Sequence, residues 1–102
     1  ITAVMCGNDQ IALGALVAAH TEALHDLMIY GVDGSPDLKK ELLKPGSLIR
    51  GTSGQSPINI GKDAAKTAFA ILNGEKYEEA IYEDVFFIDA DNVEMYGADG
   101  WQ

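Results

Sequence analysis

The chain has 102 residues, 47% of them hydrophobic and 23% charged, which fits one small packed domain and excludes a disordered segment. Sixteen acidic residues against seven basic ones give a formal net charge of -9, and this negative field argues against nucleic acid or an anionic membrane as a partner of this segment. The single cysteine, Cys6, excludes an internal disulfide framework and is expected to be a buried structural thiol.

The first predicted unit is a strand followed by a helix. Residues 1–6 form an apolar run that is typical of a buried parallel strand, and residues 7–10 form the turn that follows. A helix is predicted over residues 11–24, where alanines are frequent and larger apolar residues recur at helical spacing. These larger residues are Leu13, Leu16, Val17 and Leu24. We expect this helix to pack closely against a sheet.

The second unit repeats the order of strand and helix. A strand is predicted at residues 27–32, and Asp33 with Gly34 ends it. Ser35 followed by Pro36 is an N-cap with proline at the first helical position, so a short helix is expected to run to about residue 43.

The third unit begins with a less apolar strand at residues 47–53. Ser56 followed by Pro57 repeats the capping signal, and the helix that it opens is expected to end at Asn73. An apolar stripe runs along this helix at Ile60, Ala64, Ala68, Ile71 and Leu72.

The last predicted elements are a strand at residues 81–88 and a short helical turn within residues 89–96. Strands that alternate with helices in this way predict an α/β fold, in which a parallel sheet is joined by right-handed crossovers. The sequence shows no internal repeat and no flexible linker.

Three polar side chains follow the first three predicted strands, at Asn8, Asp33 and Gln55. The carboxyl ends of parallel strands collect small-molecule ligands, so we expect these side chains to meet at one crevice. Simpler interpretations stay open. Asn8 and Asp9 both suit a helix cap, although two successive capping residues leave one side chain free, and we expect this to be Asn8. Asp33 is equally compatible with a simple turn, and an exposed Gln55 needs no function.

The sequence offers no signal for catalysis, for a metal or for a cofactor, and we expect a binding protein rather than an enzyme. His20 and His25 are five positions apart and therefore face different sides of a helix, so they cannot share a metal ion. Residues 89–94 lack the oxygen ligand and the glycine that a calcium loop requires. No nucleophile motif accompanies the scattered carboxylates.

Three stretches closely resemble the C-terminal third of periplasmic sugar-binding proteins of the ribose and galactose type, the solute-binding components of ABC importers. They are residues 8–16 (NDQIALGAL), residues 31–37 (GVDGSPD), and residues 55–57 (QSP) together with residues 60–61 (IG). Residues 88–93 (IDADNV) look like the terminal strand and turn of that family, so the resemblance covers essentially the whole chain. The first stretch is also shared with the effector domains of lactose-repressor-type transcription factors. The alternative function is therefore that of an effector-binding domain in such a regulator.

The resemblance implies a two-lobed periplasmic-binding-protein-like α/β fold, of which this chain holds the C-terminal portion. On this interpretation residues 1–54 are part of the C-terminal sugar-binding lobe. Residues 55–80 cross the hinge and supply a helix of the N-terminal lobe, and residues 81–102 return to the C-terminal lobe. The apolar face of the helix after Pro57 then lacks its sheet, so we expect the isolated segment to reorganise, to exchange elements in a dimer, or to be a proteolytic remnant.

The resemblance also implies the ligand and the site. Asn8 and Asp33 match positions that hydrogen-bond sugar hydroxyls, and Gln55 matches a hinge position that does the same. Val32 stands where ribose-type members have a stacking aromatic, whereas galactose-type members have Val-Asp as here. The expected function is extracytoplasmic binding of a monosaccharide by domain closure and its delivery to the membrane permease of an ABC importer. The protein is expected in a periplasm or lipid-anchored at the cell surface.

Overall fold

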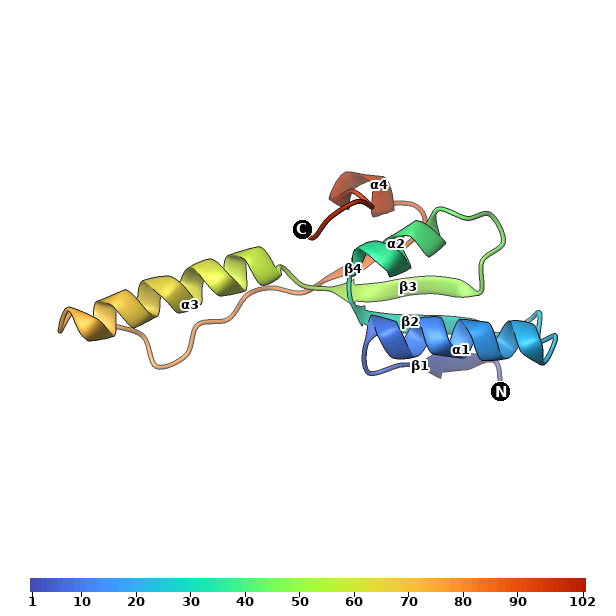
Figure 1. Cartoon of the computed structure of the whole chain (residues 1–102), viewed down its shortest axis with the longest axis horizontal. Helices are drawn as coiled ribbons and strands as arrows, with labels where there is room; N and C mark the ends of the chain where they lie inside the picture. Colours follow the sequence, from blue (N-terminus) through green and yellow to red (C-terminus); the bar gives the residue numbers. More distant parts are fainter.

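A four-stranded sheet organises the chain, and the computed structural model describes all residues from 1 to 102 (Figure 1). The strands lie in the order of the sequence: β1 (Ala3–Met5), β2 (Met28–Asp33), β3 (Ile49–Gly54) and β4 (Phe86–Ile88). The first three are parallel to one another, and β4 pairs antiparallel with β3. The predicted α/β class with a parallel sheet is therefore confirmed.

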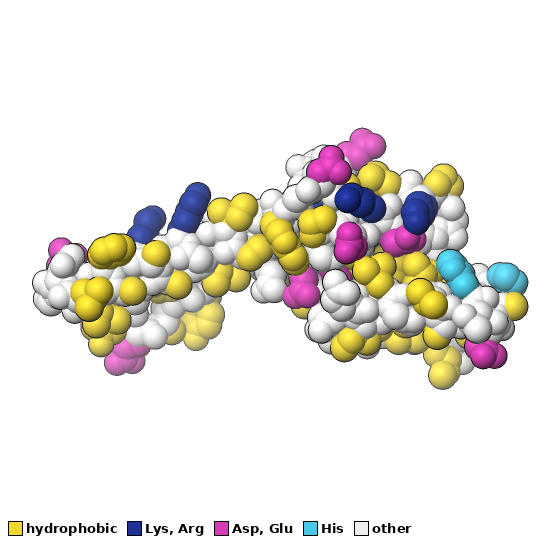
Figure 2. All heavy atoms as spheres, in the orientation of Figure 1, with side chains coloured by type: hydrophobic (Ala, Val, Ile, Leu, Met, Phe, Trp, Pro, Cys, Tyr) yellow, Lys and Arg dark blue, Asp and Glu magenta, His cyan; other side chains and the backbone are white.

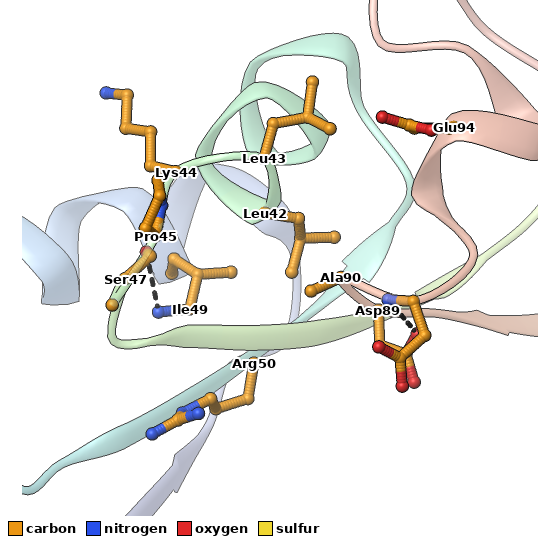
Figure 3. Close-up of a pocket in the computed structure, with 12 residues that line it drawn as sticks. Leu42, Leu43, Lys44, Pro45, Ser47, Ile49, Arg50, Asp89, Ala90 and Glu94 are labelled. Atoms are coloured by element: carbon orange, nitrogen blue, oxygen red, sulfur yellow. Dashed lines mark hydrogen bonds between the residues drawn. The ribbon is translucent and has the colours of Figure 1, made fainter.

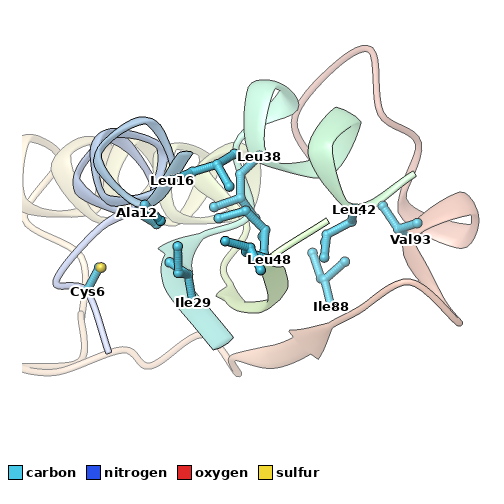
Figure 4. Packing of buried hydrophobic residues seen from close by; sticks show 11 residues of the cluster. Cys6, Ala12, Leu16, Ile29, Leu38, Leu42, Leu48, Ile88 and Val93 are labelled. Atoms are coloured by element: carbon cyan, nitrogen blue, oxygen red, sulfur yellow. The ribbon is translucent and has the colours of Figure 1, made fainter. Parts of the chain in front are cut away.

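Four helices follow the strands in turn: α1 (Asp9–Thr21), α2 (Pro36–Leu42), α3 (Pro57–Leu72) and α4 (Val93–Tyr96). α1 packs on β2, α2 packs on β3, and the two helices also contact each other on the same face of the sheet (Figure 4). None of the four combines the length and the hydrophobicity that a helix needs to cross a membrane.

The predicted caps of α2 and α3 are confirmed. Ser35 Oγ accepts a hydrogen bond from the backbone N–H of Leu38, and Ser56 Oγ accepts one from Asn59. A proline follows each serine at the start of its helix, where its missing N–H costs nothing. These two caps fix where the chain turns after β2 and after β3.

The core lies between the sheet and helices α1 and α2, and α4 closes its outer end (Figure 4). Cys6 belongs to it, as expected. α1 presents Ala12, Leu16 and Ala19 to the sheet, whereas Val17 is 65% exposed, so of the larger apolar residues only Leu16 is buried. Positions at intervals of four and three share one helical face, and the two alanines allow the close packing that the sequence predicts. The buried apolar residues are Cys6, Ala12, Leu16, Ala19, Ile29, Leu38, Leu42, Leu48, Ile49, Ile88 and Val93.

Two predicted strands are shorter and more exposed than expected. β1 covers only Ala3–Met5 and stands at the sheet edge, where Met5 is 78% exposed, because no part of this chain covers the second face of the sheet. β4 covers only Phe86–Ile88, because its partner β3 ends at Gly54 and leaves residues 81–85 without a backbone to pair with. It is antiparallel because the chain leaves the sheet at the carboxyl end of β3 and returns to that same end.

α3 projects from the sheet as an arm, and the molecule measures 58 × 25 × 16 Å (Figure 1). None of its residues is buried. Figure 2 shows apolar side chains along this arm, and Ile60, Ile71 and Leu72 of the predicted stripe are 43%, 52% and 80% exposed. The stripe is thus uncovered, as expected for a helix that lacks the sheet on which it would pack.

Candidate ligand-binding site

The parallel order of the sheet brings the three predicted polar positions to one edge. Asp33 is the last residue of β2 and pairs with Gly54, the last residue of β3, so Gln55 follows directly beside it. Asn8 follows β1, which pairs with β2 on the other side. All three side chains therefore lie after the carboxyl ends of adjacent parallel strands, where ligands of open α/β sheets bind.

Asp33 and Gln55 contact each other directly. Gln55 Nε2 donates a hydrogen bond to Asp33 Oδ1 over 3.0 Å, and the backbone N–H of Gln55 donates to the carbonyl of Asp33 over 3.1 Å. Both residues are half-buried. Asp33 Oδ2 and Gln55 Oε1 have no partner within the protein, so two acceptor oxygens are available to a ligand.

The backbone at Asp33 is strained. Its φ is 127°, in a region that favours glycine, and Gly34 follows with φ of 80°. A non-glycine residue in such a conformation costs about 1–3 kcal/mol, and positions of this kind cluster at functional sites. Strain at a residue whose carboxylate faces solvent favours a binding role for Asp33 over the simple turn that the sequence also allowed.

The expected roles of Asn8 and Asp9 are reversed. Asn8 caps α1, since its Oδ1 accepts from the backbone N–H of Ile11 over 2.8 Å, and the prediction that its side chain takes no part in capping is wrong. Its Nδ2 has no partner and stays available as a donor. Asp9 is instead fully buried and accepts from Ser35 N over 2.6 Å and from Thr52 Oγ1 over 2.7 Å. The extended backbone of Asn8 at the cap position turns the next side chain toward the sheet.

Asp9 is therefore a structural brace beneath the candidate site. Its carboxylate connects the start of α1 to the turn before α2 and to the middle of β3. Gly31 of β2 makes room for it, because a Cβ at that position would overlap Asp9 Oδ1. Sequence reasoning did not find this brace. A glycine in a strand interior, which often marks a close approach, was the available signal.

A second unpredicted network fixes the far side of the Asp33–Gln55 pair. Lys39 of α2 is fully buried, and its Nζ donates to the carbonyl of Gly100 over 2.7 Å and to Gln102 Oε1 over 2.6 Å. Gln102 Nε2 in turn donates to the carbonyl of Gln55 over 2.5 Å, with a longer contact of 3.4 Å to the carbonyl of Asp33. Burial lowers the pKa of the Lys39 ammonium, and the negative charge of Asp9 partly offsets this.

Asp33 and Gln55 open onto a shallow hollow. Its remaining walls are Pro57 and Ile58 at the start of α3, and Trp101, which is 45% exposed. The hollow thus combines a carboxylate and an amide with an aromatic ring, the mixture of side chains that polar small-molecule sites use.

Another hollow lies near the opposite end of β3, between the loop after α2 and the turn before α4 (Figure 3). Its charged lining residues are Lys44, Arg50, Asp89, Asp91 and Glu94. The side chains of Lys44, Arg50 and Glu94 lie apart around the rim in Figure 3. The carboxylate of Asp89 already accepts from the backbone N–H groups of Asp91 and Asn92. This arrangement shapes a turn and does not converge on one ligand.

The exposed face of α3 forms a groove with the segment that returns toward β4. The groove is lined by Ile60, Ile71 and Ile81 among other residues. Glu83 on the returning segment lies beside Asp63 of α3, and the hydrogen bond between these two carboxyl groups raises the pKa of Glu83.

Comparison with known proteins finds relatives among the binding proteins of sugar import. No family model matches the sequence. The chain is 41% identical over 78 residues to the ribose import binding protein RbsB of Escherichia coli, a match that covers 76% of this chain. The same match covers 26% of the relative, so the chain spans about a quarter of the length of that protein.

Solved structures agree with the sequence match. An ABC transporter solute-binding protein from Agrobacterium vitis, crystallised with allitol, superposes with a TM-score of 0.85 and 25% identity over 93% of this chain and 33% of its own. A solute-binding protein from Mycobacterium smegmatis, crystallised with glycerol, shares the fold of the whole chain at a TM-score of 0.89 and 23% identity, and 36% of it is covered. The chain is thus similar to a ribose import binding protein and to solute-binding proteins of ABC transporters, and the matches do not favour the repressor alternative.

Proposed function

We propose that this segment of a periplasmic sugar-binding protein supplies part of a monosaccharide site, and that the complete protein delivers the sugar to the membrane permease of an ABC importer without chemical change. The relatives bind their ligands without catalysis. The observation that carries the proposal is the bonded pair of Asp33 and Gln55, which offers two free acceptor oxygens at the carboxyl edge of a parallel sheet.

Each polar side chain has its own role in this proposal. Asp33 Oδ2 accepts a hydrogen bond from a sugar hydroxyl, and Gln55 Oε1 accepts from a second. Asn8 Nδ2 donates to a third, while Oδ1 of the same residue continues to cap α1. Neighbouring hydroxyls both donate and accept, so a ring of acceptors and donors recognises them better than acceptors alone.

The proposed site is completed by further protein. Residues 1–54 belong to one lobe, residues 55–80 cross to a second lobe, and residues 81–102 return to the first. Two uncovered surfaces support this division: the apolar face of α3, and the second face of the parallel sheet, which parallel sheets normally cover with helices. Sugar is then held between the lobes and released as they open.

The same uncovered surfaces predict how the isolated segment behaves. Apolar area left in water costs about 25 cal/mol per Å², so we expect the segment alone to associate, most simply as a dimer that exchanges α3. Size-exclusion chromatography with mass measurement tests this expectation. A compact and stable monomer would contradict it.

We place the complete protein outside the cytoplasm, either free in a periplasm or lipid-anchored at a cell surface. Fractionation of the source cells, with detection of the protein in each fraction, distinguishes these two locations from each other and from the cytoplasm.

Calorimetric titration of the complete protein with a panel of pentoses and hexoses tests the binding role. We expect one of these sugars to bind, and Asp33→Ala to weaken that binding about 10- to 100-fold, because a hydrogen bond to a charged acceptor contributes about 1.5–3 kcal/mol. Asp37→Ala is the matched control, since Asp37 is exposed on α2 close by. Equal affinities for the wild type and Asp33→Ala would refute the proposed role of Asp33.

A further inference from the structure

We propose that Gln102 is a positioning residue for the sugar site. Gln102 holds the Asp33–Gln55 pair in its binding geometry, and a hydrogen bond from Lys39 holds Gln102 in place. This inference rests on the proposed function of that pair. Gln102 contacts only the backbone of the pair, so it acts through Asp33 and Gln55 and does not itself touch the sugar.

The two ends of the Gln102 amide have separate tasks. Oε1 accepts from Lys39 Nζ, and Nε2 donates to the carbonyl of Gln55. The amide therefore connects a buried cation of α2 to the backbone at the point where the chain leaves β3 for α3. Residues that lie 63 and 47 positions away from Gln102 meet through this single side chain.

The contact between Lys39 and Gln102 is stable because the Lys39 ammonium has no other side-chain acceptor. Its side chain is fully buried, and the only acceptors of its ammonium are the carbonyl of Gly100 and Oε1 of Gln102. Releasing the tail would leave a buried cation without partners, which is far more costly than losing an exposed contact. Lys39 therefore keeps Gln102 in one place.

The turn after β2 is shaped around the same amide. Gly34 has φ of 80°, and a Cβ there would come within 2.7 Å of Gln102 Nε2. The neighbouring Asp33 holds its strained φ of 127° while its carbonyl accepts from Gln55 N and contacts Gln102 Nε2. Strain of this kind persists only where surrounding contacts fix it, and Gln102 supplies one of these contacts.

Gln102→Glu in the complete protein tests the inference. It keeps the acceptor for Lys39 but turns a carboxylate oxygen toward the carbonyls of Gln55 and Asp33. At neutral pH we expect the dissociation constant for the bound sugar to rise about tenfold, the effect of losing one good hydrogen bond. The ratio of the variant's dissociation constant to that of the wild type should decrease as the pH falls, because the new carboxyl is then protonated and can donate a hydrogen bond. The charged group that contacts this side chain is Lys39, whose ammonium also interacts with the carboxylate of Asp9, and both groups are present in both proteins.

A second variant guards against simple unfolding. The double substitution Lys39→Met with Gln102→Leu replaces the buried polar pair by apolar side chains, and we expect it to keep the melting temperature but not the affinity. Asp99→Asn, in the exposed part of the same tail, is the control and should bind as the wild type does. Wild-type affinity in Gln102→Glu, or a loss that does not change with pH, would overturn the inference.

Hydrogen exchange separates this inference from the proposed function, because it needs no sugar. In Gln102→Glu the backbone amide of Gln55 should exchange about tenfold faster, while amides in the middle of β3 keep their wild-type rates. If the wild type binds no sugar, the proposed function fails, and the exchange rate at Gln55 still decides whether Gln102 fixes the pair. An unchanged rate there would overturn the inference independently.

Discussion

Replacing Asp9 should destabilise the fold more than replacing any exposed carboxylate. Asp9 is fully buried, and its two oxygens accept from Ser35 N and Thr52 Oγ1 over 2.6 and 2.7 Å. Hydrogen bonds to a charged group contribute about 1.5–3 kcal/mol each, so Asp9→Ala should lower the free energy of unfolding by about 3–6 kcal/mol. The free energy of unfolding of a whole domain is about 5–15 kcal/mol, so this loss is a large share of the total.

Asp9→Asn should lower the free energy of unfolding by less than Asp9→Ala does, by about 2 kcal/mol, because an amide can reproduce the geometry of both hydrogen bonds. Its oxygen accepts from Ser35 N, and its nitrogen donates to Thr52 Oγ1 once that hydroxyl rotates. Only the contribution of the charge to each bond is lost. The expected order of stability is therefore wild type, then Asp9→Asn, then Asp9→Ala.

Urea unfolding of the complete protein measures these differences from the midpoints at constant slope. Asp26→Asn, a change at an exposed carboxylate beyond α1, should stay within about 0.5 kcal/mol of the wild type. A double-mutant cycle of Asp9→Asn with Thr52→Val should give a coupling of about 1 kcal/mol. If Asp9→Ala were as stable as the wild type, the brace would be an ordinary surface carboxylate and the reasoning would be refuted.

Gly31→Ala should lower the free energy of unfolding by about 1–3 kcal/mol in the same urea assay, because the new Cβ overlaps the Asp9 carboxylate; no loss would mean that Asp9 moves freely. Asp33→Gly should remove sugar binding in calorimetry yet raise the melting temperature, because glycine adopts φ of 127° without strain; a lower melting temperature would argue against strain. Burial lowers the pKa of Lys39 below its ordinary 10.5, so between the two values the unfolded chain binds more protons and stability rises with pH. Lys39→Met should remove this rise in urea titrations in the alkaline range below pH 10.5, and an identical slope in both proteins would contradict it.

The order of elements was predictable because its signals are local. The starts of two helices are predicted by serine–proline pairs, Ser35 with Pro36 and Ser56 with Pro57. The apolar runs before these pairs predict the strands. The approach of Asp33 and Gln55 was also predictable, because it needs only the rule that parallel strands end at one edge.

The remaining features depend on partners far along the chain. Asn8 and Asp9 are both capping types, and only the position of Ser35 and Thr52 decides which of them turns inward. The local sequence predicts that Lys39 is a solvated residue in the last turn of a helix, because Gly100, whose carbonyl it contacts, lies 61 residues later. The length of β4 depends in the same way on where β3 ends.

The arm is joined to the sheet by two lengths of backbone rather than one. The chain goes out after Gly54 and comes back into Phe86, and these two residues are paired across the strands at the point of exit. A body attached at two neighbouring points bends readily about the line through them but resists torsion, because twisting would stretch one connection against the other. We therefore expect the arm to swing along a single path, so that any surface it carries meets the Asp33 edge in the same orientation each time.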